Sequence, residues 1–141
     1  NCTIGNFVHI SAFSYVQASG GCEFKDFSGI SQGCKIYTKS SDFVNELTNS
    51  MIPKKFTKSI VSKVVLEENS DIGANTVILP GVTIGKGVAL GANSLVLKSI
   101  KKNTWSLYFG SPARFVKKRN KKNILKQKKK MLKFYKLKNL L

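Results

Sequence analysis

The chain has 141 residues, with 24 Lys or Arg against seven Asp or Glu and a formal net charge of +17. This length supports one domain with a modest core and excludes two full-sized domains. No apolar run approaches the ~18 residues of a membrane-spanning helix. The three cysteines are odd in number and lack CxxC spacing, which argues against a disulfide scaffold and favours a reducing, cytoplasmic setting.

The positive charge is unevenly distributed along the chain. Residues 1–116 carry 12 Lys or Arg against all seven acids, so their net charge is 12 − 7 = +5. Residues 117–141 carry the other 12 basic residues and no acid. The high charge therefore describes a tail more than a domain. We divide the chain into a domain at 1–116 and a basic tail at 117–141.

A large apolar side chain recurs every six residues from the start of the chain, interrupted by a slip of two residues at 19–21. This upstream series comprises Ile4, Ile10, Val16, Phe24, Ile30 and Ile36. The chain begins without a methionine and inside this repeat, so an N-terminal part missing from this sequence stays one open alternative. Residues 40–65 then abandon the period, and an interruption of that length inside a regular stack is usually functional or disordered.

The same six-residue period resumes after the interruption and runs without a break. Its large positions are Leu66, Ile72, Ile78, Ile84, Leu90 and Val96, and small or β-branched residues follow at Thr76, Val82, Val88 and Ser94. A helix needs a period of about 3.6 and a flat strand a period of 2. Short strands joined by tight corners fit a period of six instead. We therefore predict an all-β solenoid of stacked triangular coils with the large side chains on its axis.

Two segments carry a family resemblance. "ILPGVTIGKGVALGANSLVLKSI" (78–100) and "GSPARFVKKR" (110–119) resemble the hexapeptide-repeat acyltransferases, most closely the maltose, galactoside and polysaccharide O-acetyltransferase branch. The resemblance covers residues 4–119. It implies a left-handed parallel β-helix, a homotrimer, acetyl-CoA as the donor and no metal. It also implies that the 40–65 excursion loop helps to wall the active site.

Acyl transfer to a hydroxyl needs a base, and histidine suits that role because it titrates near neutrality. The chain contains one histidine, His9, in a segment that resembles the polysaccharide branch. In the maltose and galactoside enzymes the catalytic histidine lies in a Gly-His-Pro segment at the start of the excursion loop. Ser41-Asp42-Phe43 stands there instead. We predict that His9 is the catalytic base, with an exposed residue of no catalytic role as the alternative.

Four side chains are candidates for contacting the acceptor. Ser11, Tyr15 and Ser19 are near His9 in the sequence and could bond sugar hydroxyls. Asp42 could accept a hydrogen bond from an imidazole or a sugar, or could be an ordinary solvated loop carboxylate.

The resemblance also implies a cofactor groove. Ala74 and Ala92 match positions where the coil backbone meets the pantetheine arm, and a small side chain lets the arm lie close. Lys98 and Arg114 match cofactor-contacting cations, as does Lys117, and clustered cations suit the phosphates of acetyl-CoA. Trp105 could cover an adenine or cap the apolar axis, and we favour the cap.

The tail "KKRNKKNILKQKKKMLKFYKLKNLL" is predicted to form a basic amphipathic helix, whose apolar side is interrupted by Lys128. Such a helix can lie on an anionic membrane, pack against the trimer, or remain unfolded. No nucleic-acid-binding motif accompanies it, so we do not expect a nucleic-acid partner.

The sequence thus predicts a trimeric O-acetyltransferase that modifies a sugar hydroxyl of a surface polysaccharide or its precursor. Two alternatives stay open. One is N-acetylation of an amino sugar or another small acceptor, and the other is a catalytically inactive trimeric scaffold. A zinc carbonic anhydrase on the same helix is excluded, because it needs three histidine ligands and the chain has one.

Overall fold

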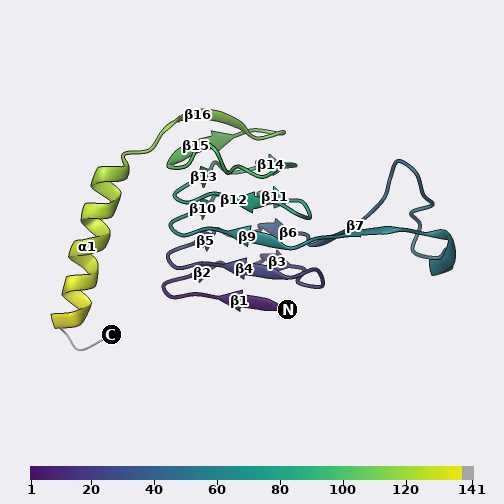
Figure 1. The fold of residues 1–141 in the computed structure, drawn as a ribbon, viewed down its shortest axis with the longest axis horizontal. Helices are drawn as coiled ribbons and strands as arrows, with labels where there is room; N and C mark the ends of the chain where they lie inside the picture. The colour runs from purple at the N-terminus through teal and green to yellow at the C-terminus, as the bar shows by residue number, and fades with distance from the viewer. Residues whose placement is uncertain (138–141) are drawn as a thin grey trace.

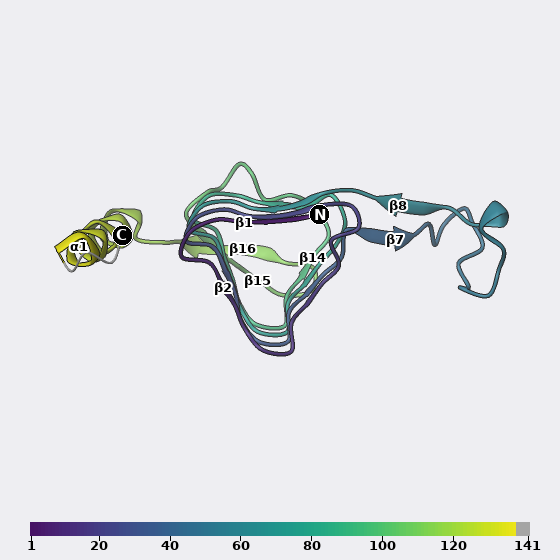
Figure 2. The same ribbon diagram turned by 90° about the horizontal axis from the view of Figure 1, so that it is seen from below.

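The computed structural model describes residues 1–137. They form a prism of short strands with a triangular outline, from which a hairpin projects at one corner and a helix at another (Figures 1 and 2). Face 1 of the prism consists of β1 (Cys2–Ile4), β4 (Cys22–Phe24), β9 (Val64–Leu66) and β12 (Thr83–Ile84). Face 3 consists of β3 (Tyr15–Val16), β6 (Lys35–Ile36), β11 (Val77–Ile78) and β14 (Leu95–Val96).

Face 2 is the longest and closes the C-terminal end of the stack. It consists of β2 (His9–Ile10), β5 (Gly29–Ile30), β10 (Asp71–Ile72), β13 (Ala89–Leu90), β15 (Ser106–Phe109) and β16 (Arg114–Lys118). Neighbouring strands are parallel within all three faces, except that β16 runs antiparallel to β15. The predicted all-β hexapeptide solenoid is therefore confirmed, and β16 carries it slightly past residue 116.

The axis of the prism is filled as the period predicts. All six large residues of the downstream series are at most 3% exposed, and the small residues between them are buried as well. Phe24, Ile30 and Ile36 join the same cluster. Because side chains alternate across a strand, each two-residue strand turns one side chain inward and one outward. The spacing of six thus sets one large inward side chain per strand.

The first coil departs from this expectation. Ile4 is 56% exposed and Ile10 is 41% exposed, although both are in register with buried residues of the next coil, Phe24 and Ile30. Within residues 1–137, the first coil stacks on the second coil alone. Its axis residues therefore have packing partners on one side and not on the other.

The corner between faces 1 and 2 is built from residues with left-handed backbone. Phe7, Phe27, Asn69 and Trp105 have φ of 55°, 59°, 60° and 52°, and Gly87 of the same column has φ of 67°. A Cβ on Gly87 would lie 2.4 Å from the Trp105 ring, so the glycine leaves room for the indole. Trp105 therefore covers this corner. The preferred axis-cap reading of Trp105 was wrong, because Tyr108 pairs in register with Leu90 and packs on the core there.

The excursion is an extended antiparallel hairpin arm that projects from the corner between faces 3 and 1 (Figures 1 and 2). Its strands are β7 (Lys39–Ser41) and β8 (Ser59–Val61), and a short 3₁₀ helix, η1 (Lys54–Phe56), lies near its tip. Compared with the expected range of 40–65, it begins one residue earlier. Residues 64 and 65 already belong to β9.

The tail forms α1 (Lys121–Leu137), which runs back along the corner between faces 1 and 2 (Figure 1). Lys128 forms an ion pair with Glu68 and lies 3.7 Å from the centre of the Phe27 ring. Tyr135 packs against Phe7 with ring centres 5.7 Å apart. The tail is therefore folded, and α1 packs on its own solenoid, while contact of its outer side with a membrane stays a prediction.

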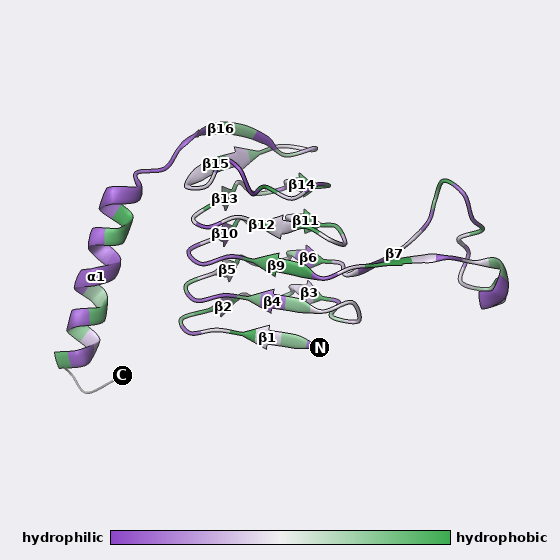
Figure 3. Cartoon of the chain, in the orientation of Figure 1, coloured by the Kyte–Doolittle hydropathy of each residue, from purple (hydrophilic) through white to green (hydrophobic). Residues whose placement is uncertain are grey.

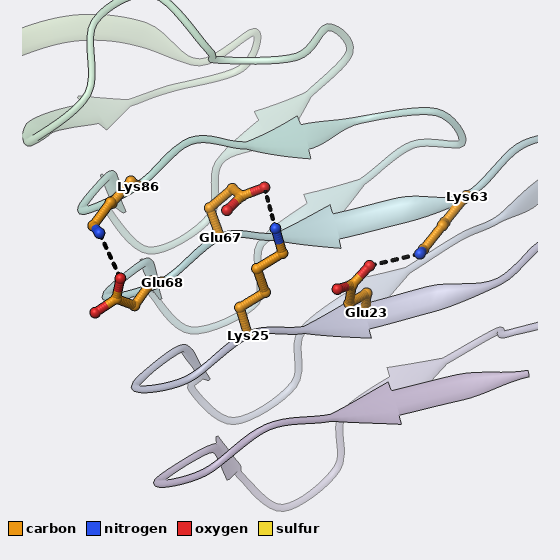
Figure 4. Close-up of polar contacts among 6 residues, drawn as sticks. All are labelled: Glu23, Lys25, Lys63, Glu67, Glu68 and Lys86. Carbon is orange, nitrogen blue, oxygen red and sulfur yellow. Dashed lines mark hydrogen bonds and ion pairs between the residues drawn. The ribbon is translucent and has the colours of Figure 1, made fainter.

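Ion pairs cover face 1 and its corner (Figure 4). Lys63 bonds Glu23 at 2.6 Å, and Lys25 bonds Glu67 at 2.9 Å. Glu68 bonds Lys86 at 2.5 Å as well as Lys128, and these lysines hold its pKa down to about 2. The acids of this side are therefore matched by lysines from neighbouring coils.

Candidate functional site

Two of the predicted cofactor residues come together at the C-terminal end of the stack. Lys98 follows β14 and Arg114 begins β16, and both line one pocket of about 350 Å³. Leu97, Ile100 and Pro112 line it as well. Two cations beside an apolar wall fit a ligand with phosphates and an organic body. The turn at 110–113 brings Arg114 back to the coil that carries Lys98, and the N–H of Ala113 bonds the carbonyl of Leu95 at 2.8 Å.

Ala74 and Ala92 stack on one another at the corner between faces 2 and 3. The backbone N–H of Asn93 donates to the carbonyl of Ala74 at 2.8 Å, and Ala92 is exposed. The coils approach closely here, since a Cβ on Gly73 would lie 2.6 Å from the backbone nitrogen of Ala92. This corner therefore offers small side chains and accessible backbone, six residues before Lys98.

Lys117 lies apart from the Lys98 and Arg114 pocket. It pairs in register with Leu107 on β15, whereas Arg114 pairs with Phe109 at the other end of the same strand. Lys117 is exposed and does not line the pocket. The structure thus brings Lys98 and Arg114 to one pocket, whereas Lys117, farther along β16, lies outside it.

His9 lies on β2 in face 2, with its side chain pointing outward next to the inward-facing Ile10. It lines a cleft of about 320 Å³ between this face and α1, together with Asn69, Asp71, Arg119 and Lys128. Arg119 donates from its Nη1 to the carbonyl of Gly87 at 2.8 Å, which helps to fix this wall. Within one chain, therefore, His9 and the Lys98 pocket are separate.

Asp71 is the residue near His9 that the sequence prediction missed. His9, Gly29 and Asp71 pair in register on three neighbouring strands, and glycine leaves a gap between the other two. A Cβ on Gly29 would lie 3.7 Å from both Asp71 Oδ1 and His9 Cβ. The signal was present, because His9 and Asp71 both directly precede an axis residue of the repeat.

The predicted acceptor residues do not converge on His9 within one chain. Tyr15 lies on face 3 and packs against Tyr37 with ring centres 5.8 Å apart. Ser19 lies in the turn beside Gly20 and lines a different hollow, with Cys22 and Lys63. Ser11 follows β2 and uses its backbone N–H to bond the carbonyl of Ile30 at 3.0 Å. They are spread around the first coil.

Asp42 begins the loop at the end of β7. Its carboxylate accepts hydrogen bonds from Asn45 Nδ2 at 3.0 Å and from the N–H groups of Val44 at 3.0 Å and Asn45 at 3.1 Å. The Asn45 side chain, followed by these two N–H groups, holds the pKa of Asp42 below its ordinary value. The charged carboxylate therefore shapes the loop, and its contact with an acceptor stays a prediction.

Comparisons with known proteins agree with this architecture. Residues 63–98 match the family described as bacterial transferase hexapeptide (six repeats). AntD, an N-acyltransferase from Bacillus cereus solved in complex with dTDP and 3-hydroxybutyryl-CoA, is 36% identical with a TM-score of 0.88. The match covers 96% of this chain and 71% of AntD. The chain belongs to the hexapeptide-repeat transferase family.

Two Escherichia coli members of the hexapeptide-repeat family align with most of the chain. A dTDP-4-amino-4,6-dideoxy-D-glucose acyltransferase is 28% identical over 120 residues, which are 84% of this chain and 62% of that protein. The putative lipopolysaccharide biosynthesis O-acetyl transferase WbbJ of strain K12 is 31% identical over 128 residues, 91% of this chain and 63% of WbbJ. The chain thus spans less than two thirds of either relative.

Proposed function

We propose that this chain is the left-handed β-helix of an enzyme that transfers an acyl group from coenzyme A to a sugar. The observation that carries the proposal is the convergence of Lys98 and Arg114 on one pocket. It occurs in a chain that is 36% identical to AntD, a protein solved with an acyl-CoA. The two cations would hold the phosphates of acetyl-CoA, and the backbone at Ala74 and Ala92 would meet its pantetheine arm.

The active enzyme we propose is a homotrimer with its sites between subunits. The outward side chains of face 3 support this, because Val77, Leu79, Leu95 and Leu97 form an apolar strip beside Tyr15 and Tyr37. Leu97 alone is 47% exposed. A strip of this kind on a solenoid face suits contact with a second copy. Assembly would also bring His9 of one subunit towards the Lys98 pocket of another.

For the acceptor, we propose a nucleotide-linked amino sugar first and a sugar hydroxyl second. AntD and the Escherichia coli amino-sugar acyltransferase favour the amine, and WbbJ favours the hydroxyl. An amine is the better nucleophile, so it needs less help than a hydroxyl in losing its proton. In either case the acceptor atom bonds to the thioester carbon and the C–S bond breaks. His9 takes the proton from the acceptor and passes it to the departing thiolate, which gives free coenzyme A.

One assay tests the proposal and separates the two acceptors. The protein is incubated with acetyl-CoA and either dTDP-4-amino-4,6-dideoxyglucose or a hydroxyl sugar, and thiol release is followed with a chromogenic disulfide. Products are then treated with hydroxylamine, which cleaves an ester and leaves an amide intact. Amide formation supports the first acceptor and ester formation the second. An absence of thiol release with every acceptor would favour the inactive scaffold.

A further inference from the structure

The outer side of α1 is basic along its whole length. The helix contains eight lysines and no acid. Seven of these lysines are exposed, and six of the seven make up what we name the lysine face: Lys122, Lys126, Lys129, Lys130, Lys133 and Lys136. At 3.6 residues per turn they fall within an arc of about 120°. The charge is therefore concentrated on one stripe of the helix.

The orientation of the lysine face is fixed by the opposite side of α1. The half-buried positions of the helix recur at helical spacing on the side opposite the lysine face: Ile124, Leu125, Lys128, Met131, Leu132 and Tyr135. The Lys128 pair with Glu68 and the packing of Tyr135 on Phe7 hold this side against the corner. Figures 1 and 2 place α1 at the opposite end of the molecule from the hairpin. The lysine face therefore points away from the solenoid.

Apolar side chains accompany the lysines near the C-terminal end of α1. Leu137 is 76% exposed and lies on the same arc as Lys126 and Lys130. Phe134 is 52% exposed at the edge of that arc. The hydropathy colouring shows green segments among the purple ones at this end of α1 (Figure 3). An outward face that is cationic and carries exposed apolar groups suits the boundary of a lipid bilayer.

We propose that the lysine face docks α1 onto an anionic phospholipid surface. Charge complementarity supports this occupant, since clusters of four to eight basic residues are attracted to anionic headgroups. No helix among residues 1–137 is long and apolar enough to cross a membrane, so the contact is peripheral. A bilayer can also take up Leu137 and Phe134, whereas the phosphate backbone of a nucleic acid cannot. This inference does not depend on acyl transfer.

Vesicle binding tests the proposal directly. The protein is sedimented with vesicles of pure phosphatidylcholine or of phosphatidylcholine containing about one third phosphatidylglycerol. We expect binding to the anionic vesicles only, and release as salt shortens the range of the charges. Each lysine near such a surface is worth about fivefold in partitioning, equivalent to ~1 kcal/mol. Lys122, Lys126, Lys129 and Lys133 are replaced with Gln. If only two of these four lysines lie close to the surface, binding should still weaken about 25-fold, so we expect a loss of at least that size.

A matched variant removes the same charge elsewhere. Four exposed lysines of the hairpin are replaced with Gln: Lys39, Lys54, Lys55 and Lys58. We expect this control to bind anionic vesicles as the parent does. Far-ultraviolet circular dichroism checks that α1 persists in both variants, and Gln retains helix propensity close to that of Lys.

Three outcomes would overturn the proposal. The parent protein could bind neutral and anionic vesicles equally, or fail to bind both. The two quadruple variants could lose the same affinity, which would mean that net charge matters and the lysine face does not. Finally, a 20-base-pair DNA duplex at equal phosphate concentration could strip the protein from the vesicles, which would identify nucleic acid as the preferred partner.

Discussion

Faces 1 and 3 are built from the same repeat but present opposite surfaces. Both send large apolar side chains to the axis, from Leu66 on face 1 to Val96 on face 3. Their outward slots differ. Face 1 carries Glu23, Lys25 and Glu67, which form ion pairs across the coils. Face 3 carries mainly aliphatic and aromatic residues, with Lys35 among them. The six-residue period therefore determines the fold, and the outward side chains determine which partner each face can bind.

The largest effect is expected when a charge is placed on face 3. Leu79→Lys would put an ammonium into the proposed subunit contact, where an unpaired buried charge costs roughly 3–5 kcal/mol. We expect the trimer to dissociate and acyl transfer to be lost, as measured by sedimentation and thiol release. Val65→Lys changes an outward position of face 1 in register with Glu23, and the sedimenting mass of the trimer should stay unchanged. Equal effects of the two variants would contradict the proposal that face 3, and not face 1, forms the subunit contact.

The proposed base, His9, lies on face 2 and not on face 3, so replacing it should affect the chemistry without affecting the proposed subunit contact. General-base assistance is worth about 10²–10⁴-fold in rate. His9→Ala should lower turnover by that order while trimer mass and acetyl-CoA affinity remain those of the parent, since this outward side chain is not part of the core. Gln32→Ala, at an exposed corner, serves as the control.

Turnover that survives in His9→Ala would point to another base. Asp71 would be the next group to test, because it lines the same cleft.

The end of face 3 is expected to hold the donor. Each charge-assisted contact is worth about 1.5–3 kcal/mol, so Lys98→Ala and Arg114→Ala should each raise the acetyl-CoA dissociation constant at least about tenfold. Calorimetry measures this without turnover. Lys39→Ala, at an exposed lysine outside the pocket, should bind as the parent does. Unchanged affinity in both pocket variants would remove them from the donor site.

The sequence predicted well which residues are buried on the axis, because a large apolar side chain stands at every sixth position. Through resemblance it also named Lys98 and Arg114 as cofactor residues, and the structure places both on one pocket. The sequence could not predict the cleft around His9, because that cleft depends on α1 returning along the corner, which brings Lys128 beside Asn69 and Asp71. Nor could the sequence predict that Trp105 lies at the corner and that Tyr108 packs at the axis. That choice depends on a left-handed backbone at Trp105, which few residues other than glycine, Asn and Asp adopt readily.

The smallest effect is expected from the ion pairs on the side of face 1. Lys128 and Lys86 lower the pKa of Glu68 from 4.5 to about 2, so the charged carboxylate stabilises the folded state above pH 4.5. That contribution should disappear as the pH falls through 4.5 towards 2, where Glu68 becomes protonated in the folded state too. Because the group is partly exposed, we expect Glu68→Gln to cost only about 1 kcal/mol at neutral pH. Urea denaturation of parent and variant at several pH values measures the difference, with Glu46→Gln in the hairpin loop as the control. A difference that stays constant between pH 7 and pH 2 would mean that Glu68 acts through its shape and not its charge.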